Sequence, residues 1–108
     1  MIRSAVRLRS LALFMNFFVY ALYSAKLDVV YIGQTKDLDK RLSDHKKGYS
    51  KYTSRSDDWI MFYSEDCDSR ANAMLREGEL KSSKGRRFLR KLYEQNEANR
   101  ISGLPEGR

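Results

Sequence analysis

Two short runs rich in β-branched and aromatic residues constrain the fold of this chain most strongly. They cover residues 17–23, Phe-Phe-Val-Tyr-Ala-Leu-Tyr, and residues 29–33, Val-Val-Tyr-Ile-Gly. This composition is typical of β-strands. The largely polar connection between the two runs has the length of a hairpin loop. We therefore predict an antiparallel hairpin that brings Tyr20 and Tyr31 into one sheet.

The rest of the chain predicts one more strand and three helices. Residues 59–63, Trp-Ile-Met-Phe-Tyr, form the third strand. This run is apolar on both sides, which favours a central strand with both faces covered, and Trp59 is expected in the core. Apolar residues at helical spacing predict helices over residues 36–47, 69–81 and 84–94.

The first predicted helix places two polar side chains on its inner face. Four residues fall at positions i, i+3, i+4 and i+7 and so share that face: Leu38, Arg41, Leu42 and His45. An inward arginine needs a carboxylate, a carbonyl or a phosphate as its partner. The alternative interpretations are an arginine that extends along the edge of the face and a histidine that is satisfied at the edge of the core.

The second predicted helix places a carboxylate in its apolar stripe, which we expect to contain Ala73, Met74, Glu77 and Leu80. Glu79 lies about 160° away and should face solvent. A carboxylate on a buried face is costly unless it is paired or binds a cation. Glu77 is therefore a candidate metal ligand, and the structural alternative is a salt bridge to Arg41.

Two basic segments are candidate contacts for nucleic acid. The third predicted helix carries a run of cations beside an apolar face: Lys84, Arg86, Arg87, Arg90 and Lys91. The loop at residues 48–58 sets Lys51 and Arg55 among tyrosines, a mixture that can hold a phosphate and stack a base. In both segments the alternative is an ordinary solvated surface.

Composition limits the cellular setting and the partners. The net charge of +7 and the pI near 9.7 suit a polyanionic partner, although charge alone does not separate nucleic acid binding from simple solubility. The single cysteine, Cys67, excludes an internal disulfide and a cysteine-cluster zinc site. We expect a cytoplasmic protein. We expect no membrane association, because no stretch is long and apolar enough to span a bilayer.

The order of these patterns resembles the GIY-YIG nuclease superfamily. Tyr31-Ile32-Gly33-Gln34-Thr35, Arg41 with His45 four residues later, and Glu77 match its motifs in order and spacing. The chain is most similar to the small single-domain members, the subclass that resembles the N-terminal domain of excision nucleases. The resemblance implies an α/β protein of the α+β type, with a small three-stranded antiparallel sheet flanked by about three helices.

The resemblance also implies the domain boundaries. The nuclease-like domain covers residues 15–94 and is preceded by an N-terminal extension at residues 1–14. Residues 95–108 hold Asn, Glu, Gly and Pro and few apolar residues, which predicts a frayed C-terminal tail.

The same resemblance implies a catalytic site. Tyr20 and Tyr31 line it, one of them as the general base, with Arg41 and His45 beside them. Glu77 holds a single divalent ion, Mg²⁺ or Mn²⁺. Two departures stand out: Phe18-Val19 replaces the usual Gly-Ile of the first motif, and no asparagine after Lys84 matches the one found in many larger members.

The residues themselves are suited to phosphodiester hydrolysis. Glu77 can anchor Mg²⁺ if the phosphate supplies a further ligand, and Arg41 can donate to the non-bridging oxygens. Tyrosine ordinarily titrates near 10 and needs help to act as a base, whereas histidine titrates near neutrality and is the better isolated base. His45 is therefore the alternative base.

We therefore expect a metal-dependent endonuclease of low sequence specificity that acts in DNA repair or recombination. DNA is the expected substrate, with RNA the alternative. The competing hypothesis is a non-catalytic nucleic-acid-binding module that keeps the fold. The inward Glu77 favours the enzyme, because binding alone does not require an inward carboxylate.

Overall fold

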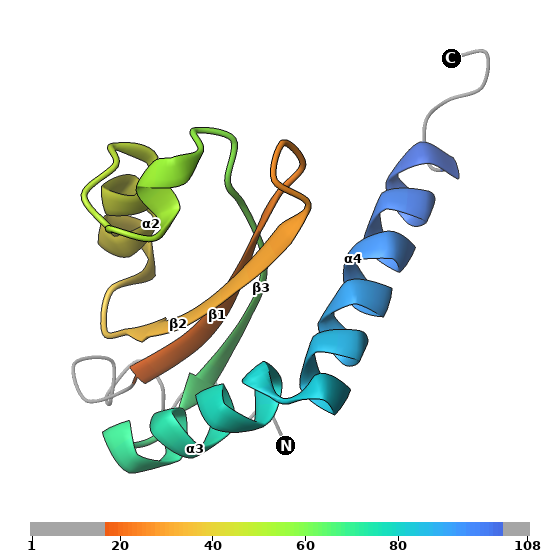
Figure 1. Cartoon of the computed structure of the whole chain (residues 1–108). Helices are drawn as coiled ribbons and strands as arrows, with labels where there is room; N and C mark the ends of the chain where they lie inside the picture. The colour runs from red at the N-terminus through yellow and green to blue at the C-terminus, as the bar shows by residue number, and fades with distance from the viewer. Residues whose placement is uncertain (1–16, 103–108) are drawn as a thin grey trace.

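The computed structural model describes residues 17–102 (Figure 1). Its elements follow in this order: β1 (Phe17–Ser24), β2 (Val29–Thr35), α2 (Leu38–Lys46), a short 3₁₀ helix η1 (Thr53–Arg55), β3 (Ile60–Cys67), α3 (Arg70–Lys81) and α4 (Ser83–Ser102). The predicted α+β fold, with an antiparallel three-stranded sheet, is confirmed. The predicted extension at residues 1–14 lies outside the described residues.

The strand order corrects one prediction. The sheet has the order β2-β1-β3, so the central strand is β1 and not β3. The apolar run at residues 59–63 is explained differently, because Trp59 is a core residue that precedes β3, while Ile60 is 56% exposed. Between them α2, α3 and α4 cover both faces of the sheet (Figure 1). Covered faces make a strand apolar on both sides even at the edge of a sheet.

Side chains of β1 alternate between two different interiors. Val19 and Ala21 belong to an apolar cluster with Leu80 of α3 and Leu89 of α4. Tyr20 and Leu22 point to the opposite face, where the following residues pack: Trp59, Leu38, Leu42 and Met61. Figure 1 shows α2 and α4 on opposite sides of the sheet. Tyr20 therefore lies on the α2 side.

Helix α2 has the inner face predicted for it. Its N-cap is Asp37, whose side chain accepts a hydrogen bond from the Lys40 backbone N–H at 3.0 Å. It ends before Gly48, which has a φ of +79° and so adopts the left-handed conformation that glycine tolerates best. His45 is fully buried on this helix.

Helix α3 confirms part of its predicted stripe. Ala73 and Leu80 are buried, and Glu79 faces solvent as expected. Met74 does not belong to the stripe, because its side chain is 54% exposed. It follows Ala73 directly, and consecutive residues on a helix lie about 100° apart.

Helix α4 is longer than the sequence predicts. It runs to Ser102, so the expected frayed tail is wrong for residues 95–102. No glycine or proline interrupts residues 86–102, and Gly103 is the first after them. Arg90 ties the helix to the hairpin through an ion pair with Asp28 at 2.6 Å. No helix among residues 17–102 is long and apolar enough to cross a membrane.

The corrected stripe of α3 can be tested by truncating two of its side chains. Leu80→Ala should lower the free energy of unfolding by about 2–5 kcal/mol, because Leu80 is fully buried between the sheet and α4. Met74→Ala, the matched control, should change it by less than about 0.5 kcal/mol. Urea unfolding followed by circular dichroism measures both changes. Equal losses of unfolding free energy in the two variants would show that Met74 packs in the core.

Candidate active site

The site forms where β1 and β2 face α2, and a glycine makes room for it. Tyr20 pairs directly with Gly33 in the hairpin register. A Cβ atom at position 33 would lie only 2.6 Å from the Tyr20 hydroxyl oxygen and 3.2 Å from the Tyr31 ring. Any larger residue would displace the Tyr20 side chain, so the glycine allows the hydroxyl to lie across the neighbouring strand.

The four predicted catalytic residues lie together. The Tyr20 hydroxyl is 2.8 Å from His45 Nε2 and accepts a longer hydrogen bond from Arg41 Nε at 3.4 Å. The Tyr31 ring lies 6.3 Å from the Tyr20 ring and 5.2 Å from the His45 ring, measured between centroids. Thr53, which sequence reasoning did not select, is 2.6 Å from His45 Nδ1 through its hydroxyl oxygen.

Burial keeps the inner part of this cluster uncharged at neutral pH. It raises the pKa of Tyr20 to about 12, although the hydrogen bond from Arg41 opposes the shift. Burial and then the charge of Arg41 lower the pKa of His45 from 6.5 to about 4, while Asp44 opposes them. His45 is fully buried with a partner on each ring nitrogen. It is therefore not the isolated, water-accessible base that its ordinary pKa suggested.

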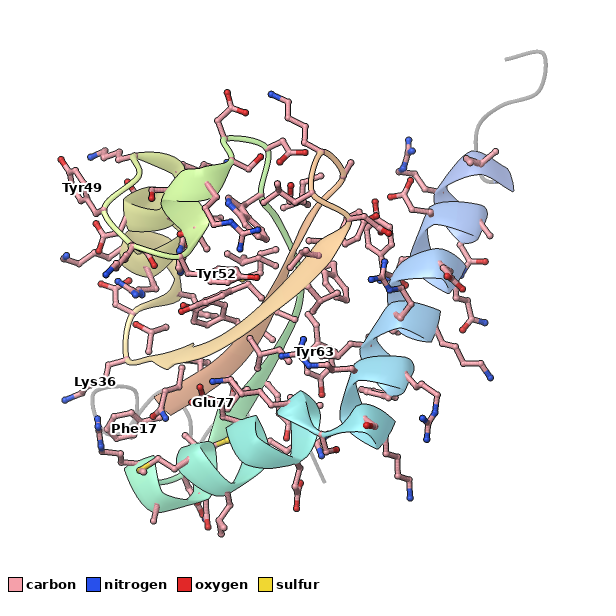
Figure 2. The ribbon with its side chains drawn as sticks, viewed as in Figure 1. Phe17, Lys36, Tyr49, Tyr52, Tyr63 and Glu77 are labelled. Atoms are coloured by element: carbon pink, nitrogen blue, oxygen red, sulfur yellow. The ribbon has the colours of Figure 1, made fainter. Side chains whose placement is uncertain are left out.

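Glu77 reaches the same end of the sheet from α3. Figure 2 shows it directed from the helix toward the strands. One carboxylate oxygen accepts a hydrogen bond from Gln34 Nε2 at 2.8 Å, and the other lies 2.7 Å from Lys81 Nζ. Within residues 17–102 it forms no ion pair with Arg41, whose guanidinium lies 3.9 Å from Asp44. Its charge still contributes to the raised pKa of Tyr20, which places the two groups within electrostatic range.

The surroundings of Glu77 suit a hard cation. Gln34 Oε1 is buried beside it and has no hydrogen-bond partner among the described residues. A carboxylate and an unsatisfied amide oxygen are ligands that Mg²⁺ accepts, with water and phosphate completing its shell. The described part of the chain contains no group of three His, Cys, Asp or Glu residues that could hold a metal alone.

Gln34 and Lys81 were both missed by sequence reasoning. Gln34 follows Gly33 in the second strand, but only the packing of α3 against β2 reveals its contact with Glu77. Lys81 had a usable signal, because it lies four residues after Glu77 on the same helix.

A second aromatic group flanks the site. Tyr52 stacks on Tyr31 at 5.4 Å between ring centroids, and the Arg55 guanidinium lies 4.7 Å from the centroid of the Tyr52 ring. Tyr52 lies between the sheet and η1 (Figure 2). Of the two predicted loop cations, Arg55 therefore contacts this aromatic group, and Lys51 is exposed next to Tyr52.

The basic residues of α4 lie elsewhere. Arg86 donates hydrogen bonds to the backbone oxygens of Val30 and Lys81, and Arg90 pairs with Asp28, so both hold the helix in place. Lys84 and Arg87 are exposed. Helix α4 covers the sheet face opposite Tyr20 (Figure 1), so its cations do not join the tyrosine cluster.

The comparisons with known proteins identify the family of this chain. The GIY-YIG catalytic domain matches residues 16–93, most of the chain, so this protein belongs to the GIY-YIG nuclease family. Among curated proteins and among solved structures nothing matches it significantly. Nucleases of this family generally use a divalent metal.

The buried histidine predicts a loss of stability in mild acid. His45 has a lower pKa in the folded chain than its ordinary value of 6.5, so between pH 6.5 and about 4 the unfolded chain binds the proton and the folded chain does not. The free energy of unfolding should fall by up to about 3 kcal/mol as pH drops through that range. Urea unfolding at several pH values measures it.

Other groups titrate in the same range, so His45→Gln is the control. This variant should lose stability less steeply between pH 6.5 and 4, whatever its stability at neutral pH. Because His45 is the only histidine, a proton NMR titration also reports its pKa directly. A measured pKa near 6.5 would contradict the burial argument.

Proposed function

We propose that this protein is a metal-dependent endonuclease that hydrolyses phosphodiester bonds in nucleic acid, with DNA as the favoured substrate. The observation that supports this most is the joint placement of Arg41, Tyr20 and Glu77 at one end of the hairpin. Arg41 uses Nε for Tyr20, and its side chain is 34% exposed, so the guanidinium keeps donors for phosphate oxygens. Negative charge that builds on the phosphate in the transition state is stabilised there.

The carboxylate and the tyrosines have separate tasks in this proposal. Glu77 and Gln34 would hold a single divalent ion, Mg²⁺ or Mn²⁺, which when bound neutralises phosphate charge and favours ionisation of water. Tyr20 and Tyr31 lie beside Arg41, and the Tyr20 oxygen is the better placed base because Arg41 Nε already donates a hydrogen bond to it. Lys81 balances the Glu77 charge in the absence of metal.

Low sequence specificity and a role in DNA repair or recombination complete the proposal. The exposed cations Lys51 and Arg55 are of the kind that contact phosphates, which position a nucleic acid without reading its bases. A cytoplasmic location is also proposed, since the free, buried Cys67 suits a reducing compartment.

The ion pair between Glu77 and Lys81 also supports the competing hypothesis of a non-catalytic binding module. A lysine can neutralise the carboxylate permanently, and the fold then needs no metal. The two functions are separated by incubating the protein with plain, nicked, branched and single-stranded DNAs and RNAs, in Mg²⁺, Mn²⁺ or a chelator. Metal-dependent cleavage of any of these nucleic acids supports the nuclease. Binding of a nucleic acid without cleavage supports the binding module.

Substitution of Glu77 gives the sharper test. Glu77→Gln keeps the shape of the side chain but removes its charge, so metal affinity and cleavage should be lost while nucleic acid binding persists. The free energy of unfolding should fall by less than about 1 kcal/mol, because the pair with Lys81 is only partly buried. Calorimetric titration with Mn²⁺, a cleavage assay and urea unfolding measure the three effects.

Glu79→Gln is the matched control, since Glu79 lies on the same helix with its side chain 65% exposed. It should leave metal affinity and cleavage unchanged. If the Glu77→Gln protein binds Mn²⁺ as tightly as the parent, the Glu77 carboxylate is not a metal ligand.

The placement of the cations predicts which segment follows the phosphate backbone. Replacing Lys51 and Arg55 by glutamine should weaken binding and reduce the slope of log affinity against log salt, by about 0.7–0.9 for each phosphate that the variant no longer neutralises. These residues adjoin the Tyr31–Tyr52 stack. Fluorescence anisotropy at several salt concentrations measures the slope.

The matched variant replaces Lys84 and Arg87, which are equally charged and exposed but belong to α4. It should change the slope less. A larger change in this variant would assign the phosphate track to α4 instead.

A further inference from the structure

A basic cleft lies at the end of the sheet where the hairpin turns. Its volume is about 410 Å³, and its walls come from the hairpin turn, the C-terminal end of α2 and the segment around η1 (Figure 1). Four cations and one carboxylate line it, a net charge of +3: Lys26, Lys46, Lys47, Arg55 and Asp57. Charges of one sign that line a concave surface concentrate the field there and attract an oppositely charged ligand.

Hydrogen bonds hold the walls of the basic cleft in place. The Asp58 carboxylate accepts hydrogen bonds from the Ser24 hydroxyl at 2.6 Å and from the Lys26 backbone N–H at 2.9 Å. These bonds join the segment after η1 to the hairpin turn, and Ser24 is fully buried. On the other side, a contact of 2.6 Å between His45 Nδ1 and the Thr53 hydroxyl oxygen holds α2 against η1. The cleft is therefore formed before a ligand binds, which lowers the entropy cost of binding.

The cations of the cleft are available to a ligand. Lys46 and Lys47 are exposed, and like Arg55 they form no ion pair with a carboxylate within residues 17–102. Lys26 pairs with Asp57 at 2.8 Å, but the two side chains are 66% and 79% exposed. An exposed ion pair contributes little free energy, so a phosphate can replace Asp57 as the partner of Lys26.

Arg55 connects the basic cleft to the tyrosine cluster. Its guanidinium lies 4.7 Å from the centroid of the Tyr52 ring, and that ring stacks on Tyr31 at 5.4 Å between centroids. One side of Arg55 therefore belongs to the aromatic group that flanks the candidate active site, and Arg55 also lines the cleft. The cleft is thus a charged continuation of the site rather than a separate surface.

We infer that the basic cleft binds phosphodiester groups of a nucleic acid strand that passes the tyrosine cluster. Lysine and arginine neutralise phosphates without reading bases, so the cleft adds affinity that depends on salt and not on sequence. This inference rests on the proposed function, because the ligand is the nucleic acid of that proposal. The Asp57 carboxylate repels a phosphate in the same cleft, so it lowers the affinity that the four cations provide.

Neutralising the two lysines of α2 tests the inference. Anisotropy of a fluorescein-labelled DNA, and of the RNA of the same sequence, measures binding in a chelator, where metal-dependent cleavage is absent. Lys46→Gln combined with Lys47→Gln should weaken binding and reduce the slope of log affinity against log salt, by about 0.7–0.9 for each phosphate no longer neutralised. A purely structural role at the end of α2, where cations favour the helix dipole, would lower stability but leave the slope unchanged.

The matched variant combines Lys84→Gln with Lys91→Gln, which removes the same charge from exposed positions of α4. It should change the slope less than the α2 variant does. Equal changes in the two variants would show that only the net charge matters, and they would overturn the inference.

A gain of affinity gives a test that damage to the fold cannot imitate. Asp57→Asn frees Lys26 and removes the repulsion, so affinity should rise about 1.5- to 5-fold, the factor that one exposed ion pair is worth. Glu94→Gln, the control, removes one negative charge from an exposed position of α4 and should raise affinity less. Equal affinities of these two variants would contradict a phosphate beside Asp57.

Inorganic phosphate distinguishes a backbone site from a site for a free anion. In a chelator, the backbone amide signals of Leu27, Gly48 and Ser56, which line the cleft, should shift on titration with a short oligonucleotide. Inorganic phosphate should need a far higher concentration to produce the same shifts. Saturation by both at the same concentration of phosphate groups would identify a free-phosphate site and overturn the inference.

The results separate this inference from the nuclease proposal. A parent protein that binds through the cleft in a chelator but cleaves nothing with Mg²⁺ or Mn²⁺ counts against the nuclease alone. A parent that cleaves, together with a Lys46 and Lys47 variant that keeps the parent affinity and slope, counts against the cleft alone.

Discussion

The register of the central strand β1 is the constraint on which the site depends. Successive side chains of a strand point to opposite faces, and here the two faces are chemically different. Val19 and Ala21 enter an apolar cluster with α3 and α4, while Tyr20 enters a polar cluster with α2. A slip of one residue would bury the Tyr20 hydroxyl among Leu80 and Leu89 and leave alanine at the site. Apolar packing on one face therefore fixes the position of the hydroxyl on the other.

Local patterns were enough to predict the hairpin, the presence of the helices, the inward face of α2 and, apart from Met74, the inward face of α3. Each depends on the spacing of neighbouring residues, as in the placement of Arg41 and His45 together on α2. The strand order was not predictable in this way. An apolar run such as residues 59–63 reports that the faces are covered, and it does not report which strands lie beside it. That α4 continues past residue 94 could have been inferred, since no helix-breaking residue occurs there.

The state of His45 shows where sequence reasoning about the site stops. Helical spacing turns the imidazole inward, but burial lowers its pKa, and its ring nitrogens contact Tyr20, 25 residues away, and Thr53, eight residues away. Neither contact follows from a periodic pattern. The same holds for Gln34, whose contact with Glu77 spans 43 residues. Sequence identified the catalytic candidates, and tertiary packing determined their protonation and partners.

The site also separates neutral groups from charged ones, and this separation has a physical cause. Tyr20, His45 and Thr53 are almost completely buried, and burial favours the uncharged forms of the tyrosine and the histidine. Arg41, Glu77 and Lys81 keep part of their surface in water, which lowers the cost of their charge. The fold thus keeps the charged groups at the rim of the cluster and the uncharged groups inside it.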